Sequence, residues 1–338
     1  MNQIMFVTLS SQDEIASYAI DSATGQINET SRIHVSGRPA PLAADIGNRV
    51  LYVGRRNIPL VSSFIFDETG ALSSLSDGPE LLGDPCYISL DNTRQSLFGA
   101  YYNAGAASVH RLSEGKIGEE VQWIETGSGA HCIMADRGNN FVLLPHIAGE
   151  KGLNTIRLFK FDERQGILSD NNPNEYKQIE NRGPRHYVFH PTNKFVYFSN
   201  EQESSVTGYE YHSSSGQISE IDTKSTLPAQ FSGPNTCAQI RISPTGDYLY
   251  APNRGHDSIA IFSVNSITGE LTPIGRVRTE PTPRVLNIDF SGKYLYSAGL
   301  DSGYISLFKI LENGNLEFVD RYEVGSEPMW IEIVNIED

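Results

Sequence analysis

The sequence contains few of the residues that mark several common protein classes. Its 338 residues include three cysteines, two tryptophans and four methionines, and 26 Lys and Arg are outnumbered by 41 Asp and Glu. Cys86, Cys132 and Cys237 are odd in number and widely spaced, with no CxxC pair. This pattern argues against a disulfide framework, a zinc site or a redox dithiol. We therefore expect three reduced, mostly buried thiols.

Long apolar runs are also missing. No segment approaches the roughly 18 apolar residues that a membrane span needs, and Met1 to Ser10 lack the basic and apolar regions of a secretion signal. The formal charge of −15 opposes binding to nucleic acid or to an anionic membrane, because no basic run offsets it. We expect a cytoplasmic monomer or weak homo-oligomer whose partner is a small molecule, with no nucleic acid and no membrane.

Several catalytic motifs are absent as well. The sequence has no G-x-S-x-G elbow, no HExxH, no P-loop, no GxGxxG after a strand and no His/Asp/Glu set with metal-ligand spacing. We therefore expect no cofactor, no metal and no covalent nucleophile.

The strongest positive signal is an internal repeat. A Gly followed two residues later by an aliphatic residue recurs every 45 to 53 residues, at Gly25, Gly70, Gly115, Gly166, Gly216, Gly269 and Gly314. Each of these glycines follows a short polar cluster, which is typical of a hairpin turn that needs a positive φ. Apolar segments precede each turn, and a second apolar series lies further upstream. Each repeat thus contains two hairpins, or four strands.

Four strands per ~45 residues, repeated seven times, predict an all-β, seven-bladed β-propeller that occupies residues 1–338 as a single domain. The N-terminal segment Ile4 to Thr8 corresponds to the second strand of a repeat, whereas Met329 to Val334 is a lone inner strand. Together the two ends would complete one blade. This closure joins the ring and leaves no exposed inner edge.

Polar residues recur at one end of the predicted inner strands. Aligning the turns of four repeats places His131, Arg185, Ala238 and Arg284 at equivalent positions. The ends of the second strands, on the same face, add Arg55, Tyr101, Tyr102, His146, Glu201 and Arg254. For any single Arg–Glu pair, filling a polar channel is the simpler interpretation. Four arginines and one acid in a strongly acidic protein instead predict a site for an anion that carries phosphate or carboxylate.

The sequence resembles the seven-bladed β-propeller lactonase family over essentially its whole length. The similarity is carried by Gly183–Pro191 (GPRHYVFHP), Ser199-Asn200-Glu201, Pro283–Asp289, Glu327–Trp330, Ser128–Cys132 and Tyr101–Gly105. Bacterial members of that family include 6-phosphogluconolactonase of the pentose phosphate pathway, and the family also contains a fungal carboxymuconate cyclase. The resemblance implies hydrolysis of a sugar-acid lactone, with 6-phosphoglucono-δ-lactone as the expected substrate.

The resemblance also implies a set of functional residues. The family's proposed His, Arg, Glu and second Arg correspond to His131, Arg185, Glu201 and Arg254, with Arg284 as the alternative to Arg254. Substrate binding is expected from Arg55, Arg284, His186 and Tyr101. Glu201 or His131 would activate water as a general base, and Arg185 would stabilise the oxyanion.

Three other functions are alternatives to this interpretation. A cycloisomerase acting on carboxylated muconates has the same charge requirements. A non-catalytic interaction propeller is disfavoured because no repeat contains a Trp-Asp dipeptide. A six-bladed, calcium-dependent lactonase would need acidic and amide ligands where this sequence has Arg and His.

Overall fold

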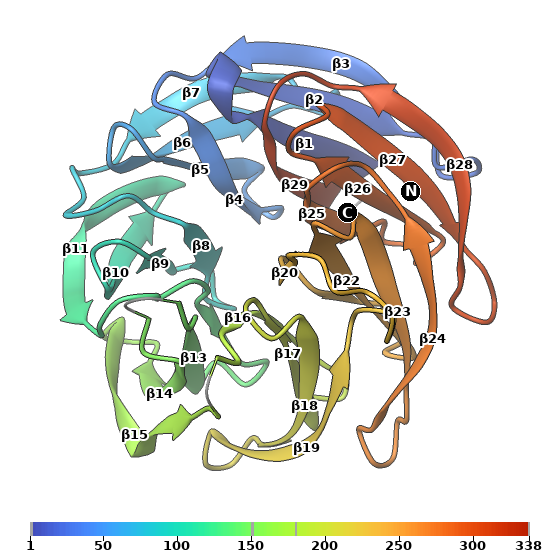
Figure 1. Ribbon diagram of the computed structural model, residues 1–338. Coiled ribbons are helices and arrows are strands. Elements are labelled where there is room, and N and C mark those ends of the chain that lie inside the picture. The colour runs from blue at the N-terminus through green and yellow to red at the C-terminus, as the bar shows by residue number, and fades with distance from the viewer. Residues whose placement is uncertain (1–2, 150–151, 180, 337–338) are drawn as a thin grey trace.

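The computed structural model describes residues 3–149, 152–179 and 181–336. Within these ranges, 29 strands and one short 3-10 helix (Ser10–Gln12) form seven sheets arranged around a central axis (Figure 1). Six sheets have four strands, and in the seventh the innermost strand is split in two. The predicted seven-bladed propeller is confirmed. No helix in the described part of the chain is long and apolar enough to cross a membrane.

We number the blades along the chain and give each from its inner to its outer strand. Blade 1 consists of β29 (Pro328–Asn335), β1 (Gln3–Leu9), β2 (Glu14–Ile20) and β3 (Ile27–His34). Blade 2 consists of β4 (Pro39–Asp45), β5 (Val50–Arg55), β6 (Leu60–Phe66) and β7 (Leu72–Asp77). Blade 3 consists of β8 (Tyr87–Leu90), β9 (Ser96–Tyr101), β10 (Ala106–Ser113) and β11 (Lys116–Glu125). Blade 4 consists of β12 (Met134–Ala135), β13 (Phe141–His146), β14 (Thr155–Asp162) and β15 (Ile167–Lys177).

The remaining blades follow the same order. Blade 5 consists of β16 (Pro184–Phe189), β17 (Phe195–Asn200), β18 (Ser205–His212) and β19 (Gln217–Ser225). Blade 6 consists of β20 (Thr236–Cys237) and β21 (Arg241–Ile242), then β22 (Tyr248–Arg254), β23 (Ser258–Val264) and β24 (Leu271–Arg278). Blade 7 consists of β25 (Pro283–Ile288), β26 (Tyr294–Gly299), β27 (Tyr304–Ile310) and β28 (Leu316–Glu323).

The two ends of the chain close the ring in blade 1. β29 pairs antiparallel with β1 from Gln3 opposite Asn335 to Leu9 opposite Pro328. The blue and red ends of the ribbon therefore lie side by side in Figure 1. The closure predicted from the offset of the repeats agrees with this pairing.

Burial follows from the stacking of the blades. Every residue of β1, β9 and β17 is buried, because these second strands are covered by a neighbouring blade on each face. The outermost strands β3 and β28 instead alternate between more and less exposed residues, because one face meets solvent. The apolar core accordingly lies between blades, in several clusters around the ring.

The repeated glycines serve the contacts between blades. All seven have a positive φ, as predicted for the outer hairpin turns. At Gly216 an added Cβ would lie 2.2 Å from the ring of Phe141, and at Gly269 it would lie 2.5 Å from the ring of Phe195. In both cases the aromatic ring belongs to the preceding blade. Glycine is therefore required twice, for the turn and for close packing.

Candidate active site

An extra residue interrupts the inner strand of several blades near one mouth of the central channel. The pairing of β16 with β17 skips Arg185, that of β25 with β26 skips Arg284, and that of β29 with β1 skips Met329. Such a β-bulge leaves one residue out of the ladder and redirects its side chain. All three side chains line a common cavity at the channel mouth.

Three further blades have the same irregularity. The inner strand has one residue more than its partner over 39–42 in blade 2, over 130–134 in blade 4 and over 237–241 in blade 6. His131 and Gln239 lie within the last two segments, and both line the cavity. The bulge is thus a recurrent device that directs side chains towards the channel axis.

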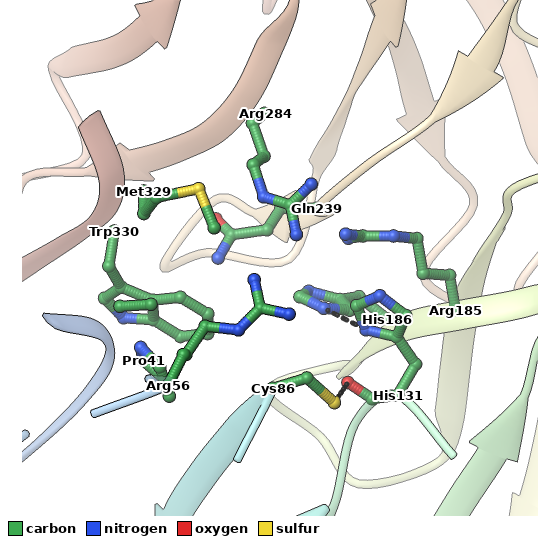
Figure 2. Close-up of a pocket in the computed structure, with 11 residues that line it drawn as sticks. Pro41, Arg56, Cys86, His131, Arg185, His186, Gln239, Arg284, Met329 and Trp330 are labelled. Carbon is green, nitrogen blue, oxygen red and sulfur yellow. Dashed lines mark hydrogen bonds between the residues drawn. The ribbon is translucent and has the colours of Figure 1, made fainter. Parts of the chain in front are cut away.

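All seven blades contribute to this cavity, which Figure 2 shows. It is lined by Ala40, Pro41, Arg56, Cys86, His131, Arg185, His186, Gln239, Arg284, Met329 and Trp330. Its volume is about 310 Å³ including the part open to solvent, and the lining side chains fill most of its interior.

Arg185 is the most deeply buried arginine of the site. It is 1% exposed, and its Nε lies 2.6 Å from Oε2 of Glu201. Arg254 Nη2 lies 3.1 Å from the same carboxylate oxygen and also donates to the Cys237 carbonyl at 2.7 Å. Two guanidinium groups thus share one carboxylate, and a net positive charge remains.

Three guanidinium groups extend towards the same space in Figure 2, from Arg56, Arg185 and Arg284. Burial and then the charge of Arg254 lower the pKa of Arg185 to about 10. Burial and then the charges of Arg185, Arg254 and Arg56 lower the pKa of Arg284 to about 9. Both groups stay cationic at neutral pH. Their mutual repulsion would be relieved by a bound anion.

Buried donors without partners point to the same conclusion. Among the described residues, Arg185 Nη1 and Gln239 Nε2 are buried donors without a hydrogen-bond partner, and His186 Nδ1 is a buried ring nitrogen without one. All three residues line the cavity. An unpaired buried polar group costs roughly 1–3 kcal/mol, so a ligand with several acceptor oxygens would stabilise this arrangement.

A histidine pair forms one side of the cavity. His131 Nδ1 and His186 Nε2 are 3.2 Å apart, within hydrogen-bond distance. Burial, followed by the charge of Arg185, holds the pKa of both histidines well below the usual range. Both imidazoles are therefore uncharged at neutral pH.

Within the described residues, no group of three or more His, Cys, Asp or Glu side chains is arranged to hold a metal ion. The three cysteines are free, as expected: Cys132 and Cys237 are buried and Cys86 is half-buried.

The sequence profile of the family described as "Lactonase, 7-bladed beta-propeller" matches residues 4–333. The chain belongs to this lactonase family. Proteins named 6-phosphogluconolactonase from Pectobacterium atrosepticum and Enterobacter sp. are 32% and 35% identical to it, over 100% and 99% of both chains respectively. The resemblance inferred from the sequence motifs is thereby confirmed, and the chain is an enzyme of a lactonase family.

A solved structure supports the fold of this lactonase. The periplasmic gluconolactonase of Pseudomonas aeruginosa superposes with a TM-score of 0.90 over 100% of both chains, at 22% sequence identity. Because the identity is low, this likeness shows the propeller architecture alone.

The lactonase brings most of the predicted site residues together. His131, Arg185, His186 and Arg284 line the cavity, Glu201 pairs with Arg185, and Arg254 pairs with Glu201. The close approach expected for residues distant in the sequence is therefore observed.

Arg55 and Tyr101 lie elsewhere, and this corrects two predicted positions. Arg55 donates to the Ser36 carbonyl at 2.6 Å and pairs with Asp77 at 3.3 Å, outside the cavity lining. The Tyr101 hydroxyl is 2.7 Å from Ser108 Oγ, within the core between blades 2 and 3. Each is the last residue of its strand, and its side chain turns into the blade rather than towards the axis.

Two other mouth positions need similar correction. His146 is buried and its Nε2 lies 3.0 Å from Thr126 Oγ1, away from the cavity. Ala238 is also buried, and its neighbour Gln239 lines the cavity in its place.

Seven cavity residues were not predicted from the sequence: Ala40, Pro41, Arg56, Cys86, Gln239, Met329 and Trp330. One signal could have found three of them. A proline directly precedes a cavity residue in Pro39-Ala40, Pro85-Cys86, Pro184-Arg185, Pro283-Arg284 and Pro328-Met329. Proline suits the first position of a strand, because no ladder donor is needed there.

Proposed function

We propose that this lactonase hydrolyses 6-phosphoglucono-δ-lactone to 6-phosphogluconate, and that it serves the pentose phosphate pathway. The observation that carries the proposal is the convergence of Arg56, Arg185 and Arg284 on one cavity, in a protein of net charge −15. Guanidinium groups bind phosphate through paired hydrogen bonds. The names of the full-length relatives support the same substrate.

In this proposal the three arginines bind different parts of the substrate. Arg56 and Arg284 hold the phosphate, and Arg185 faces the lactone carbonyl beside the histidine pair. Arg185 Nη1 has no protein partner among the described residues, so it is free to donate to the oxyanion. One such donor is typically worth ~3–4 kcal/mol of transition-state stabilisation.

His131 is the better candidate for the general base. Glu201 Oε2 is already occupied by contacts to Arg185 Nε and Arg254 Nη2. When His131 Nδ1 carries the proton, it donates to His186 Nε2 and leaves its own Nε2 lone pair free. Glu201 then acts by holding Arg185 in place.

The reaction follows from these roles. His131 Nε2 takes a proton from water as the water oxygen bonds to the lactone carbonyl carbon, and Arg185 stabilises the resulting oxyanion. The carbonyl re-forms as the ring C–O bond breaks. The leaving ring oxygen takes the proton back from His131, and the carboxylic acid releases its proton to solvent. The products are one hydroxyl and one carboxylate, and no covalent enzyme intermediate is formed.

The experiment compares three substrates with purified protein. Hydrolysis of 6-phosphoglucono-δ-lactone, glucono-δ-lactone and a carboxymuconolactone is followed by proton release, with the spontaneous rate subtracted. We expect the phosphorylated lactone to have the highest kcat/KM, by about 100-fold, since a charge-assisted contact contributes about 1.5–3 kcal/mol. Equal rates with and without phosphate would contradict the proposal. Preference for the muconolactone would favour the cycloisomerase alternative.

Two sequence-based expectations also remain proposals. One is a cytoplasmic location, to be checked by cell fractionation, since one structural relative is named as periplasmic. The other is a monomer or weak homo-oligomer, to be checked by analytical ultracentrifugation.

A further inference from the structure

Trp330 separates two cavities along the propeller axis. Its ring lines the active-site cavity of about 310 Å³ and also a larger cavity of about 850 Å³ further down the channel, both volumes including space open to solvent. The larger cavity is lined by residues that include Tyr87, Ser89, Arg241 and Glu332. It has room for solvent, whereas the active-site cavity is nearly filled. One face of the Trp330 indole can therefore be influenced from outside the substrate site.

Glu332 holds the indole from the channel side. Trp330 Nε1 donates to Glu332 Oε2 at 3.3 Å, and both residues lie on the same face of β29. Among the described residues, no ion pair involves Glu332, and the indole is the sole hydrogen-bond donor to its carboxylate. Arg241 and Tyr87 also face this part of the channel, and Arg241 donates to Asn287 Oδ1 at 3.2 Å.

An aromatic cluster connects Trp330 to the histidine pair. The Trp330 ring centroid lies 5.2 Å from that of Tyr87 and 6.3 Å from that of His186. Tyr87 and His186 pack edge to face at 5.1 Å. His186 in turn contacts His131 at 3.2 Å. A shift of the indole would therefore change the position of the imidazole that orients the base.

We propose that Glu332 is a positioning residue for the lactonase reaction: from the axial channel it fixes Trp330, and through Trp330 it fixes His186 and His131. The inference rests on the proposed function, because His131 is the base there. Glu332 itself touches neither the cavity nor any residue assigned to the phosphate.

The first test compares three variants by kcat and KM. Glu332→Leu removes the acceptor at similar volume, and we expect kcat/KM to fall about tenfold because a buried indole N–H loses its partner. Glu332→Gln keeps an amide oxygen as acceptor, so kcat/KM should stay within about threefold of wild type. The matched control is Ser89→Ala, which loses a hydrogen bond to the Ile133 carbonyl in the same channel section. It should keep wild-type kcat and KM.

The second test observes Trp330 directly. The chain has two tryptophans, and Trp123 packs against Tyr101 in another cluster. In a Trp123→Phe background, fluorescence emission therefore reports Trp330 alone.

The expected signal is a pH titration of this emission. Burial, opposed by the charge of Arg241, raises the pKa of Glu332 to about 7. Protonation weakens a charge-assisted hydrogen bond, so Trp330 emission should titrate near neutral pH. The titration should disappear with Glu332→Gln. The ionisable groups nearest to Glu332 are Arg241 and Tyr87, with Asp289 in the adjoining cavity.

The outcomes separate the two proposals. If wild-type protein hydrolyses the lactone and Glu332→Leu matches Ser89→Ala, Glu332 has no positioning role. A lower melting temperature of Glu332→Leu with unchanged kcat and KM would also exclude that role, because it would show a structural effect only. If wild-type protein hydrolyses no lactone, the proposed function fails. The substrate-free emission titration then still decides whether Glu332 controls Trp330.

Discussion

Glu201 Oε2 lies 2.6 Å from Arg185 Nε and 3.1 Å from Arg254 Nη2, so one carboxylate joins the inner strand of blade 5 to the second strand of blade 6. Its side chain is 16% exposed and that of Arg185 is 2% exposed. In such surroundings the carboxylate offsets part of the repulsion between two arginines. Its main effect is therefore to fix Arg185.

Replacing Glu201 by Gln should lower both stability and activity. Breaking a buried ion pair by removing one partner typically costs about 3–5 kcal/mol, and the released Arg185 would no longer face the carbonyl. We expect kcat/KM to fall about 100-fold or more, as for loss of an oxyanion donor. The matched control is Glu203→Gln, which removes a contact to Arg182 at 3.3 Å outside the cavity.

The pH–rate profile distinguishes a general base from a residue that positions Arg185. If Glu201 were the base, the acidic limb would disappear in Glu201→Gln; if His131 is the base, the limb stays.

Arg55 and Arg56 form a natural matched pair. The two residues are adjacent, yet only Arg56 lines the cavity, whereas Arg55 pairs with Asp77. Arg56→Met should raise KM for the phosphorylated lactone about 10- to 100-fold, since a hydrogen bond to a charged group contributes about 1.5–3 kcal/mol. It should leave hydrolysis of glucono-δ-lactone nearly unchanged. Arg55→Met should change neither parameter. A similar loss in both variants would exclude a specific phosphate contact.

Acid should destabilise the protein through its buried histidines. Burial lowers the pKa of His110, and both of its ring nitrogens lack partners among the described residues. Burial likewise lowers the pKa of His146 to about 4. A histidine in the unfolded chain has a pKa of ~6.5, so below that pH the unfolded state binds more protons and the free energy of unfolding falls. Above that pH the stability is fully present.

The measurement is the melting temperature between pH 8 and pH 5. His110→Leu should show a smaller loss of melting temperature over this range than wild type, because one site of preferential protonation is removed. His34→Leu is the control, because His34 is exposed on β3. Parallel curves for His110→Leu and wild type would show that His110 does not contribute to acid sensitivity.

The fold could be predicted from the sequence because its main constraint is local and repeated. Each outer turn needs a residue at positive φ, and at Gly216 and Gly269 packing against an aromatic ring of the preceding blade excludes a Cβ as well. Both requirements are met by the same residue, a glycine that recurs at a regular interval in the sequence. Ring closure was also predictable, because the first and last repeats are each incomplete.

The site could be predicted only in part, because bulges decide which residue faces the axis. Aligning the repeats by their turns places Arg185 and Arg284 correctly, but it places Ala238 where Gln239 lines the cavity. The bulge in blade 6 falls within 237–241, and its position in the strand cannot be read from residue spacing. Successive residues of a strand point to opposite faces, so an error of one residue reverses the assignment. Arg56 lies in the turn directly after β5, where the strand pattern does not predict the direction of a side chain.

Removing the last strand should open the ring. A chain ending at Glu327 lacks β29, and with it the partner of β1 and the cavity residues Met329 and Trp330. Burial of an apolar side chain contributes roughly 1.5–3 kcal/mol, and β29 buries four with little exposure: Trp330, Ile331, Ile333 and Val334. Their loss is comparable with the about 5–15 kcal/mol that stabilises a typical domain. We therefore expect an insoluble chain or a melting temperature at least about 15 °C lower, since even 1 kcal/mol shifts the melting temperature by a few degrees.

A chain ending at Asn335 keeps all of β29 and should melt close to wild type. Adding a synthetic peptide of residues 326–338 to the shorter chain should restore cooperative melting, because the edge of β1 is then paired again. Wild-type melting of the chain ending at Glu327, without peptide, would show that the ring does not depend on this closure.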